Sequence, residues 1–150
     1  MIVRGRWFFF YGTLAQDHDN ALTRAIRPLL IGGRRATVRG RLWAMRAAGG
    51  WYPALRRGRG TVWGRLYRAG PCFSTRHMRL LDAYEDHDPR RPARSEYRRR
   101  EVRVRVAGGG SVMAMAYIYN HPVHAGLRVI AGGDFAAFIV RHGLRAFGAD

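Results

Sequence analysis

The sequence contains no lysine, and all 27 of its basic residues are arginine. It has a single cysteine, Cys72, which excludes an internal disulfide and a multi-cysteine metal site. No apolar run approaches the roughly 18 residues that a membrane-spanning helix needs, and the aromatic run near the N-terminus is too short for a signal-peptide core. We therefore expect a cytoplasmic protein with no membrane partner.

The absence of lysine also bears on the net charge of +17, which taken alone suggests nucleic-acid binding. Lysine and arginine both neutralise phosphate, so selection for phosphate binding would normally use both. An arginine-only chain rich in alanine and glycine is more simply explained by GC-rich coding. We expect no specific nucleic-acid partner, but we do expect nonspecific adhesion to polyanions at low salt.

What the sequence does contain is enough apolar material for a folded core, with 47% hydrophobic and 12% aromatic residues in 150. We expect one domain over residues 1–150. A continuous apolar run predicts a strand buried on both faces, and four alternating segments predict further strands. These five segments are Trp7–Tyr11, Arg35–Met45, Thr61–Ala69, Tyr97–Val106 and Val112–Tyr119.

Helix signals separate some of these strands. Caps at Asp17–Asn20, at Ser74 and at Asp134 precede apolar residues at helical spacing, which predicts helices near 21–29, over 74–85 and after 134. Residues 46–60 are predicted to be mostly loop, 86–95 an exposed loop and 120–132 irregular. The expected fold class is α+β, with a strongly curled or closed sheet.

One residue of the second helix conflicts with its predicted surroundings. Met78, Leu81 and Tyr84 define the buried stripe, and Glu85 lies about 20° from Met78 around the helix axis at about 100° per residue. A carboxylate is thus directed at the core, near a helix C-terminus where the macrodipole disfavours negative charge. From periodicity alone, Glu85 is either a surface residue past a frayed helix end or a buried carboxyl, and burial among apolar groups would raise its pKa and make it a candidate general base.

Short motifs in a fixed order give the chain a family resemblance. It resembles the γ-glutamylcyclotransferase-like (AIG2-like) family over roughly residues 7 to 120, with Gly133 and Asp134 matching the start of a closing helix. The matching pieces are YGTL at 11–14 with Asn20, GRL at 40–42, YPAL at 52–55, VWGRLY at 62–67, LDAYE at 81–85, YRR at 97–99 with Val102 and Val104, and AYIY at 116–119.

The resemblance implies a small mixed β-barrel flanked by helices. It also implies an enzyme that cyclises a γ-glutamyl group to 5-oxoproline and releases the attached amine, with Glu85 as the catalytic base and no metal or cofactor. The turn formed by Tyr11, Gly12, Thr13 and Leu14 would hold the γ-glutamyl group. We add Tyr52, Pro53, Tyr117 and Tyr119 to the expected substrate-binding residues, the last two as phenol hydroxyl donors.

Two positions depart from the pattern of many members, which have glycine where this chain has Asp17 and Asp86. The branch that acts on γ-glutamylamines tolerates an acidic residue at the second position, which favours that branch. The amine side of the substrate stays open, although the arginines around 56–59 and 90–100 favour an acidic leaving portion.

The sequence also permits other interpretations. A non-catalytic relative that binds a small acidic ligand, and a basic nucleic-acid-binding module, stay as alternatives. Cys72 is interpreted as incidental, and His121 and His124 match no common metal-ligand template. Of the remaining glutamates, Glu96 follows a Pro-Arg loop, and Glu101 is expected to form an ion pair on an arginine-rich strand face.

Overall fold

The computed structural model describes residues 6–12, 15 and 20–147. Within that part of the chain the strands are β1 (Trp7–Phe10), β2 (Leu30–Ala47), β3 (Gly50–Ala69), β4 (Tyr97–Val106), β5 (Ser111–Tyr119) and β6 (Leu127–Val129). The α-helices are α1 (Ala21–Ile26), α2 (Thr75–Tyr84) and α3 (Phe135–His142), with short 3-10 helices η2 (Arg27–Leu29) and η3 (Pro92–Arg94).

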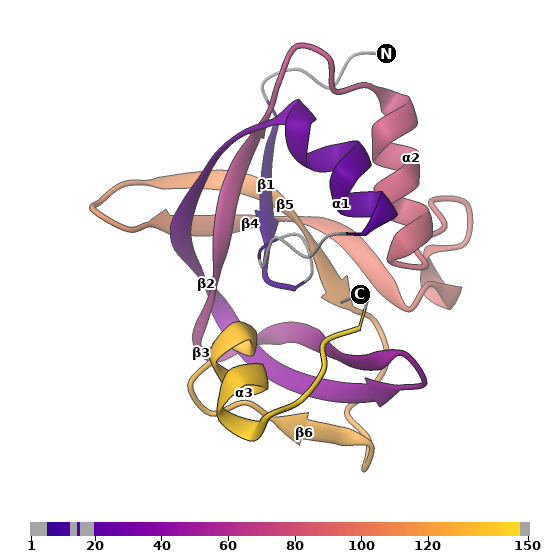
Figure 1. Cartoon of the computed structure of the whole chain (residues 1–150), viewed down its shortest axis with the longest axis vertical. Coiled ribbons are helices and arrows are strands. Elements are labelled where there is room, and N and C mark those ends of the chain that lie inside the picture. Colours follow the sequence, from indigo (N-terminus) through magenta and orange to yellow (C-terminus); the bar gives the residue numbers. More distant parts are fainter. Residues whose placement is uncertain (1–5, 13–14, 16–19, 148–150) are drawn as a thin grey trace.

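Five of the described strands close into a barrel. They follow the order β3-β1-β5-β4-β2, and a further pairing of β2 with β3 completes the ring (Figure 1). The β1–β5 pair is parallel and the other pairs in the ring are antiparallel, so the barrel is mixed. The short strand β6 extends the sheet beyond β2. The predicted α+β fold with a closed sheet is confirmed.

The aromatic run of β1 serves two hydrophobic cores because successive side chains of a strand point to opposite faces. Phe9 and Tyr11 belong to one buried cluster with Val62, Leu66 and other barrel residues. Phe8 and Phe10 belong to a second cluster that includes Met78 and Leu81 of α2. The predicted burial of this strand on both faces is confirmed.

The helices begin at the predicted caps. The Asn20 side chain accepts a hydrogen bond from the Thr23 backbone N–H at 2.9 Å, and Asp134 does the same for Ala137 at 3.1 Å. Ser74 and His77 form a reciprocal capping box at the start of α2. Asp17 lies outside the described residues. No helix in the described ranges has the length and apolar character needed to cross a membrane.

Two segments were predicted wrongly. Residues 46–60 are not mostly loop. Only residues 48 and 49 form the turn between β2 and β3, and Trp51–Arg56 pairs with Arg41–Arg46. The Gly- and Arg-rich part is a bulge at residues 57–60, across from Gly40, inside a strand that continues on both sides. Residues 120–132 include β6, whose three residues are too few to show a strand pattern.

Candidate active site

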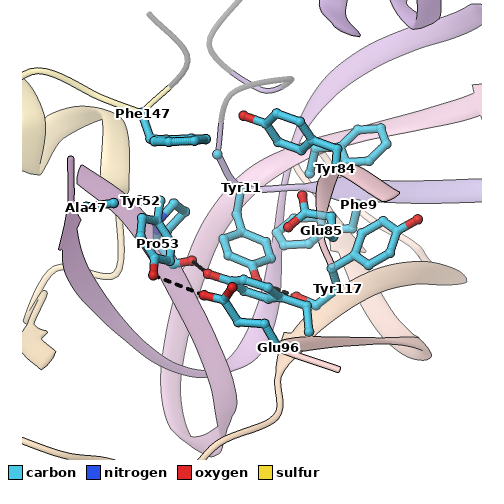
Figure 2. A pocket seen from close by; sticks show the side chains of 13 residues that line it. Phe9, Tyr11, Ala47, Tyr52, Pro53, Tyr84, Glu85, Glu96, Tyr117 and Phe147 are labelled. Carbon is cyan, nitrogen blue, oxygen red and sulfur yellow. Dashed lines mark hydrogen bonds between the residues drawn. The ribbon is translucent and has the colours of Figure 1, made fainter. Parts of the chain in front are cut away.

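A cavity of about 250 Å³ lies between β1, the β2–β3 hairpin, the end of α2 and the start of β4 (Figure 2). Among the described residues its walls are mostly aromatic and apolar. They consist of Phe9, Phe10, Tyr11, Gly12, Ala47, Tyr52, Pro53, Tyr84, Glu85, Glu96, Tyr97, Tyr117 and Phe147. Such a concave, apolar space with a few polar groups is the usual form of a small-molecule site.

Glu85 reaches this cavity from the C-terminus of α2. Its backbone N–H still bonds to the Leu81 carbonyl at 3.1 Å, so the last helical turn fixes its position. Burial raises the pKa of its carboxyl from 4.5 to about 8, and the nearby Glu96 carboxylate adds to this rise. The conflict between charge and periodicity in the sequence thus corresponds to a carboxyl group inside a cavity.

Glu96 is a second carboxylate in the same cavity, and the sequence interpretation did not select it. The Tyr52 hydroxyl donates to its Oε1 at 3.0 Å, and its backbone N–H donates to the Asp86 carbonyl at 3.1 Å. Asp86 directly follows Glu85 and has a positive φ of 52°, which turns the chain out of the helix. The loop from Asp86 to Ser95 therefore returns to the point where it left, and brings the two glutamates together.

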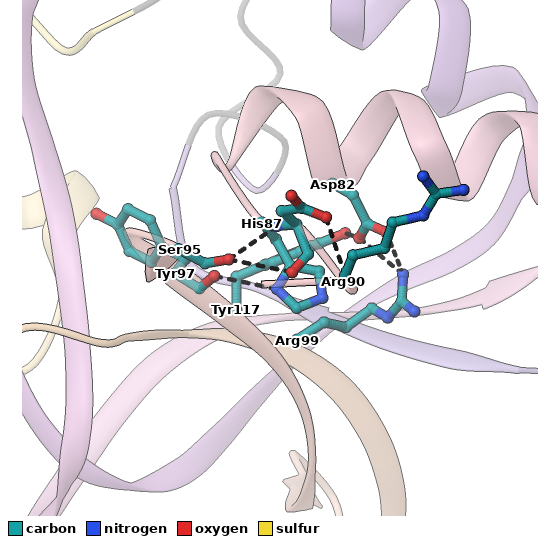
Figure 3. A network of polar contacts seen from close by, with 8 residues as sticks. Asp82, His87, Arg90, Ser95, Tyr97, Arg99 and Tyr117 are labelled. Atoms are coloured by element: carbon teal, nitrogen blue, oxygen red, sulfur yellow. Dashed lines mark hydrogen bonds and ion pairs between the residues drawn. The ribbon is translucent and has the colours of Figure 1, made fainter. Parts of the chain in front are cut away.

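Two tyrosines of the cavity, Tyr11 and Tyr117, use their hydroxyls within the protein. The Tyr11 hydroxyl donates to the Tyr117 backbone carbonyl, and the Tyr117 hydroxyl donates to Asp82 at 2.7 Å. Asp82, one turn before Glu85 on α2, is buried and also pairs with Arg99 at 2.6 Å (Figure 3). Burial raises the phenol pKa of both Tyr11 and Tyr117, so they stay neutral. This network fixes α2 to β4 and β5 beside the cavity.

The structure brings together six of the expected site residues. Tyr11, Gly12, Tyr52, Pro53, Glu85 and Tyr117 all line the cavity. Tyr119 is not among the lining residues, because it packs behind Tyr97 with ring centroids 5.5 Å apart, and its hydroxyl lies 3.3 Å from His124 Nε2. Thr13 and Leu14 lie outside the described residues.

Two lining residues, Phe147 and Tyr97, were not among the expected site residues, although Tyr97 belongs to one of the family motifs. Phe147 comes from the C-terminal segment, whose residues bond to Trp51 on β3: the Trp51 N–H donates to the Arg145 carbonyl at 2.8 Å, and the Phe147 N–H to the Trp51 carbonyl at 2.6 Å. Tyr97 lies at the start of β4 and donates its hydroxyl to the Pro53 carbonyl at 2.6 Å. These contacts are long-range, and no local pattern reveals them.

Comparison with solved structures places this fold among known proteins. An AIG2-like protein from Mus musculus is 22% identical with a TM-score of 0.69, and the match covers 95% of each chain. A structure described as gamma-glutamyl cyclotransferase is 17% identical with a TM-score of 0.55, over 84% of this chain and 70% of that one. An uncharacterised protein from Pyrococcus horikoshii is 16% identical with a TM-score of 0.56, over 92% and 96%. These likenesses concern the fold.

The sequence itself carries the family assignment. The family described as "Gamma-glutamyl cyclotransferase, AIG2-like" matches residues 8–137, and the chain belongs to this family. Among curated proteins, no match to the sequence was found. The matched range includes both glutamates of the cavity, and Phe147 lies beyond it.

Proposed function

We propose that the protein is a γ-glutamyl cyclotransferase that converts the γ-glutamyl group of a small amine or peptide conjugate to 5-oxoproline, with Glu85 as general base and then general acid. Its membership of the family supports the reaction class. The observation that carries the assignment of Glu85 is its position: a carboxyl with a raised pKa in an apolar cavity, beside the Tyr11–Gly12 turn.

The chemistry needs one residue that can accept and return a proton. Glu85 takes a proton from the substrate α-ammonium, and the freed nitrogen attacks the γ-carbonyl carbon, so that a C–N bond forms and the carbonyl oxygen becomes an oxyanion. Collapse of this intermediate breaks the bond to the leaving nitrogen, which receives the proton from Glu85. The attacking nitrogen loses two protons in all and the departing amine gains two, so no water, metal or oxidant is consumed.

The raised pKa of Glu85 suits this exchange. The pKa of an ordinary glutamate carboxyl is about four units below that of an α-ammonium, so proton transfer to the carboxylate would be strongly unfavourable. A pKa of about 8 is close to that of an α-amino group, so the transfer becomes nearly even in free energy. The same carboxyl, once protonated, is still acidic enough to protonate the leaving nitrogen.

The test is release of 5-oxoproline from a panel of γ-glutamyl conjugates by the wild type, by Glu85→Gln and by Glu101→Gln. Glu101 is exposed in an ion pair with Arg6 at 3.7 Å and serves as a matched control. We expect Glu85→Gln to lower kcat/KM by at least about 10²-fold, as expected for loss of a general base, and Glu101→Gln to match the wild type. Equal release by wild type and Glu85→Gln would refute the role of Glu85.

The pH profile gives a second measurement. Because the free enzyme needs the unprotonated carboxylate and the substrate needs its α-ammonium proton, kcat/KM of the wild type should rise with pH to an optimum near 8 and fall above it. A profile already flat between pH 5 and 7 would contradict a raised pKa at the catalytic base. If no conjugate yields 5-oxoproline while binding is detected, the protein is a non-catalytic binding protein.

A further inference from the structure

The charge inside the cavity is opposite to that of the molecule. The chain carries a net charge of +17, yet the acidic and basic residues among the described lining of the cavity are two glutamates. The arginines that suggested an acidic leaving portion do not line it; Arg99 pairs with Asp82, and Arg56 bonds to the His121 backbone carbonyl. An acidic leaving group would therefore enter a cavity whose described lining bears carboxylates and no arginine.

Glu96 is not needed for the proton transfers assigned to Glu85. One of its oxygens accepts a single hydrogen bond from Tyr52, whereas a carboxylate can accept about four. The substrate α-carboxylate would be repelled by Glu96, so this end of the cavity does not suit the acidic end of the γ-glutamyl group. A cationic group on the amine side satisfies Glu96 without competing for Glu85.

Aromatic rings on the same cavity, one of which contacts Glu96 directly, strengthen this preference. Phe147 packs against both Tyr52 and Tyr84, with ring centroids 6.0 and 6.4 Å away, so the three rings form a connected rim on the cavity (Figure 2). Phe147 is 39% exposed, which places this rim at the entrance. Aromatic faces attract ammonium groups, and a carboxylate beside them adds a charge-assisted hydrogen bond.

We propose that Glu96, with the rim of Tyr52, Tyr84 and Phe147, is a subsite for a second ammonium group, so that the preferred substrates are γ-glutamyl conjugates of linear diamines. This inference rests on the proposed cyclotransferase activity. The γ-glutamyl half lies at Glu85 and the Tyr11–Gly12 turn. The leaving amine extends toward the entrance, and its far ammonium contacts the Glu96 carboxylate and the rings.

The experiment compares three conjugates of similar length. They are γ-glutamyl-1,4-diaminobutane, its neutral isostere γ-glutamyl-n-pentylamine, and γ-glutamyl-5-aminopentanoate, which ends in a carboxylate. We expect kcat/KM for the diamine conjugate to exceed that of the neutral one by about 10-fold or more, in line with a charge-assisted hydrogen bond. The carboxylate conjugate should be the poorest of the three.

Two variants test the subsite itself. Glu96→Gln should reduce the ratio of diamine to neutral kcat/KM to below about 3-fold, because the charged hydrogen bond is lost. Any effect of Glu96 on the pKa of Glu85 changes kcat/KM for both conjugates by the same factor. It therefore does not change the ratio of the two values. Phe147→Leu keeps an apolar side chain but removes the ring face. With Glu96 intact, this variant should also lower the ratio of diamine to neutral kcat/KM. Glu101→Gln is the control.

The outcomes separate this inference from the proposed function. Equal kcat/KM for the diamine and neutral conjugates, with 5-oxoproline released from both, would overturn the subsite and leave the cyclotransferase assignment intact. A ratio that persists in Glu96→Gln would overturn the role of Glu96. Loss of both conjugates to the same extent in Glu96→Gln would mean that Glu96 acts on the shared γ-glutamyl half, which also overturns the subsite.

Discussion

At the scale of single residues, the raised pKa of Glu85 that the proposed chemistry uses also lowers the free energy of unfolding. Its carboxyl has a pKa of about 8 in the folded protein and about 4.5 in the unfolded chain. Between these values the folded protein holds a proton that the unfolded chain has released, so folding becomes less favourable as pH rises from 4.5 to 8. Below pH 4.5 both states are protonated and the cost vanishes.

Glu85→Gln removes this titration and should stabilise the protein at the upper end of that range. We expect the variant to exceed the wild type by about 1–3 kcal/mol in free energy of unfolding at pH 8, and by almost nothing at pH 4.5. Urea unfolding at both pH values measures the difference. Glu101→Gln, which changes an exposed carboxylate, should show no such widening gap. A constant difference at all pH values would contradict a raised pKa.

The two glutamates also show how far local sequence reasoning reaches. Helical periodicity directs Glu85 toward Met78 and Leu81 but leaves open an exposed position at a frayed helix end, and the LDAYE motif of the family resemblance decided between the two. Glu96 was not predictable, because its place in the cavity depends on a backbone bond to Asp86 and on the Tyr52 hydroxyl, 44 residues away in the sequence. Its neighbours in sequence look like an ordinary loop end.

At the scale of elements, Asp82 connects α2 to the strands behind the cavity. It accepts hydrogen bonds from Arg99 on β4 and Tyr117 on β5, and is only 6% exposed. Asp82→Asn would leave the partly buried Arg99 without its counter-charge, which costs about 3 kcal/mol. The end of α2, and Glu85 with it, would lose its fixed position, so we expect kcat/KM to fall by about 10-fold as well.

The measurement combines urea unfolding with 5-oxoproline release. Glu101→Gln breaks a comparable but exposed ion pair with Arg6 and should cost less than about 1 kcal/mol. If Asp82→Asn changed stability no more than this control, the network would not hold the helix. If stability fell but the pH profile and kcat/KM were those of the wild type, Asp82 would not position Glu85.

The connection into α3 depends on a glycine. Gly133 has a φ of 66°, and a Cβ there would lie 1.8 Å from the Thr61 carbonyl oxygen, while its own carbonyl accepts from the Trp63 N–H at 2.8 Å. Gly133→Ala should therefore destabilise the protein by at least about 2 kcal/mol. Neighbouring Gly132 has nothing within 4 Å of such a Cβ and no positive φ, so Gly132→Ala is the control and should change stability little. Equal unfolding midpoints for the two variants would refute this packing.

Elements with a clear hydrophobic periodicity or a capping residue were predictable from the sequence. Strands that form because they pair with a neighbouring strand were not. The Trp7–Phe10 strand and the caps at Asn20, Ser74 and Asp134 follow from side-chain type and spacing. The start of β3 does not alternate: its residues after Gly50 are held by register with β2, from Met45 opposite Tyr52 to Arg41 opposite Arg56. Pairing to an existing strand overrides weak strand propensity in a Gly- and Arg-rich segment.

At the scale of the whole molecule, positive charge lies on the outside of the barrel and not among the described lining of the cavity. Exposed arginines alternate along the strands with residues that face the core, as on β2 and β4, where Arg39, Arg41, Arg100, Arg103 and Arg105 are exposed. This alternation explains how a net charge of +17 coexists with a cavity that contains carboxylates. The two features are spatially separate and can be tested independently.

We therefore expect polyanion binding that depends on salt and does not compete with substrate. Fluorescence anisotropy with mixed-sequence single-stranded and duplex DNA should show binding at about 50 mM salt that weakens by about 10³-fold at 200 mM, without sequence preference, as expected for counterion release. Because the described lining of the cavity contains no arginine, saturating DNA at low salt should leave the KM for a γ-glutamyl conjugate unchanged. Sequence-dependent binding that survives 200 mM salt would instead favour the nucleic-acid-binding alternative. Competition between DNA and the conjugate would mean that the basic surface extends into the active site.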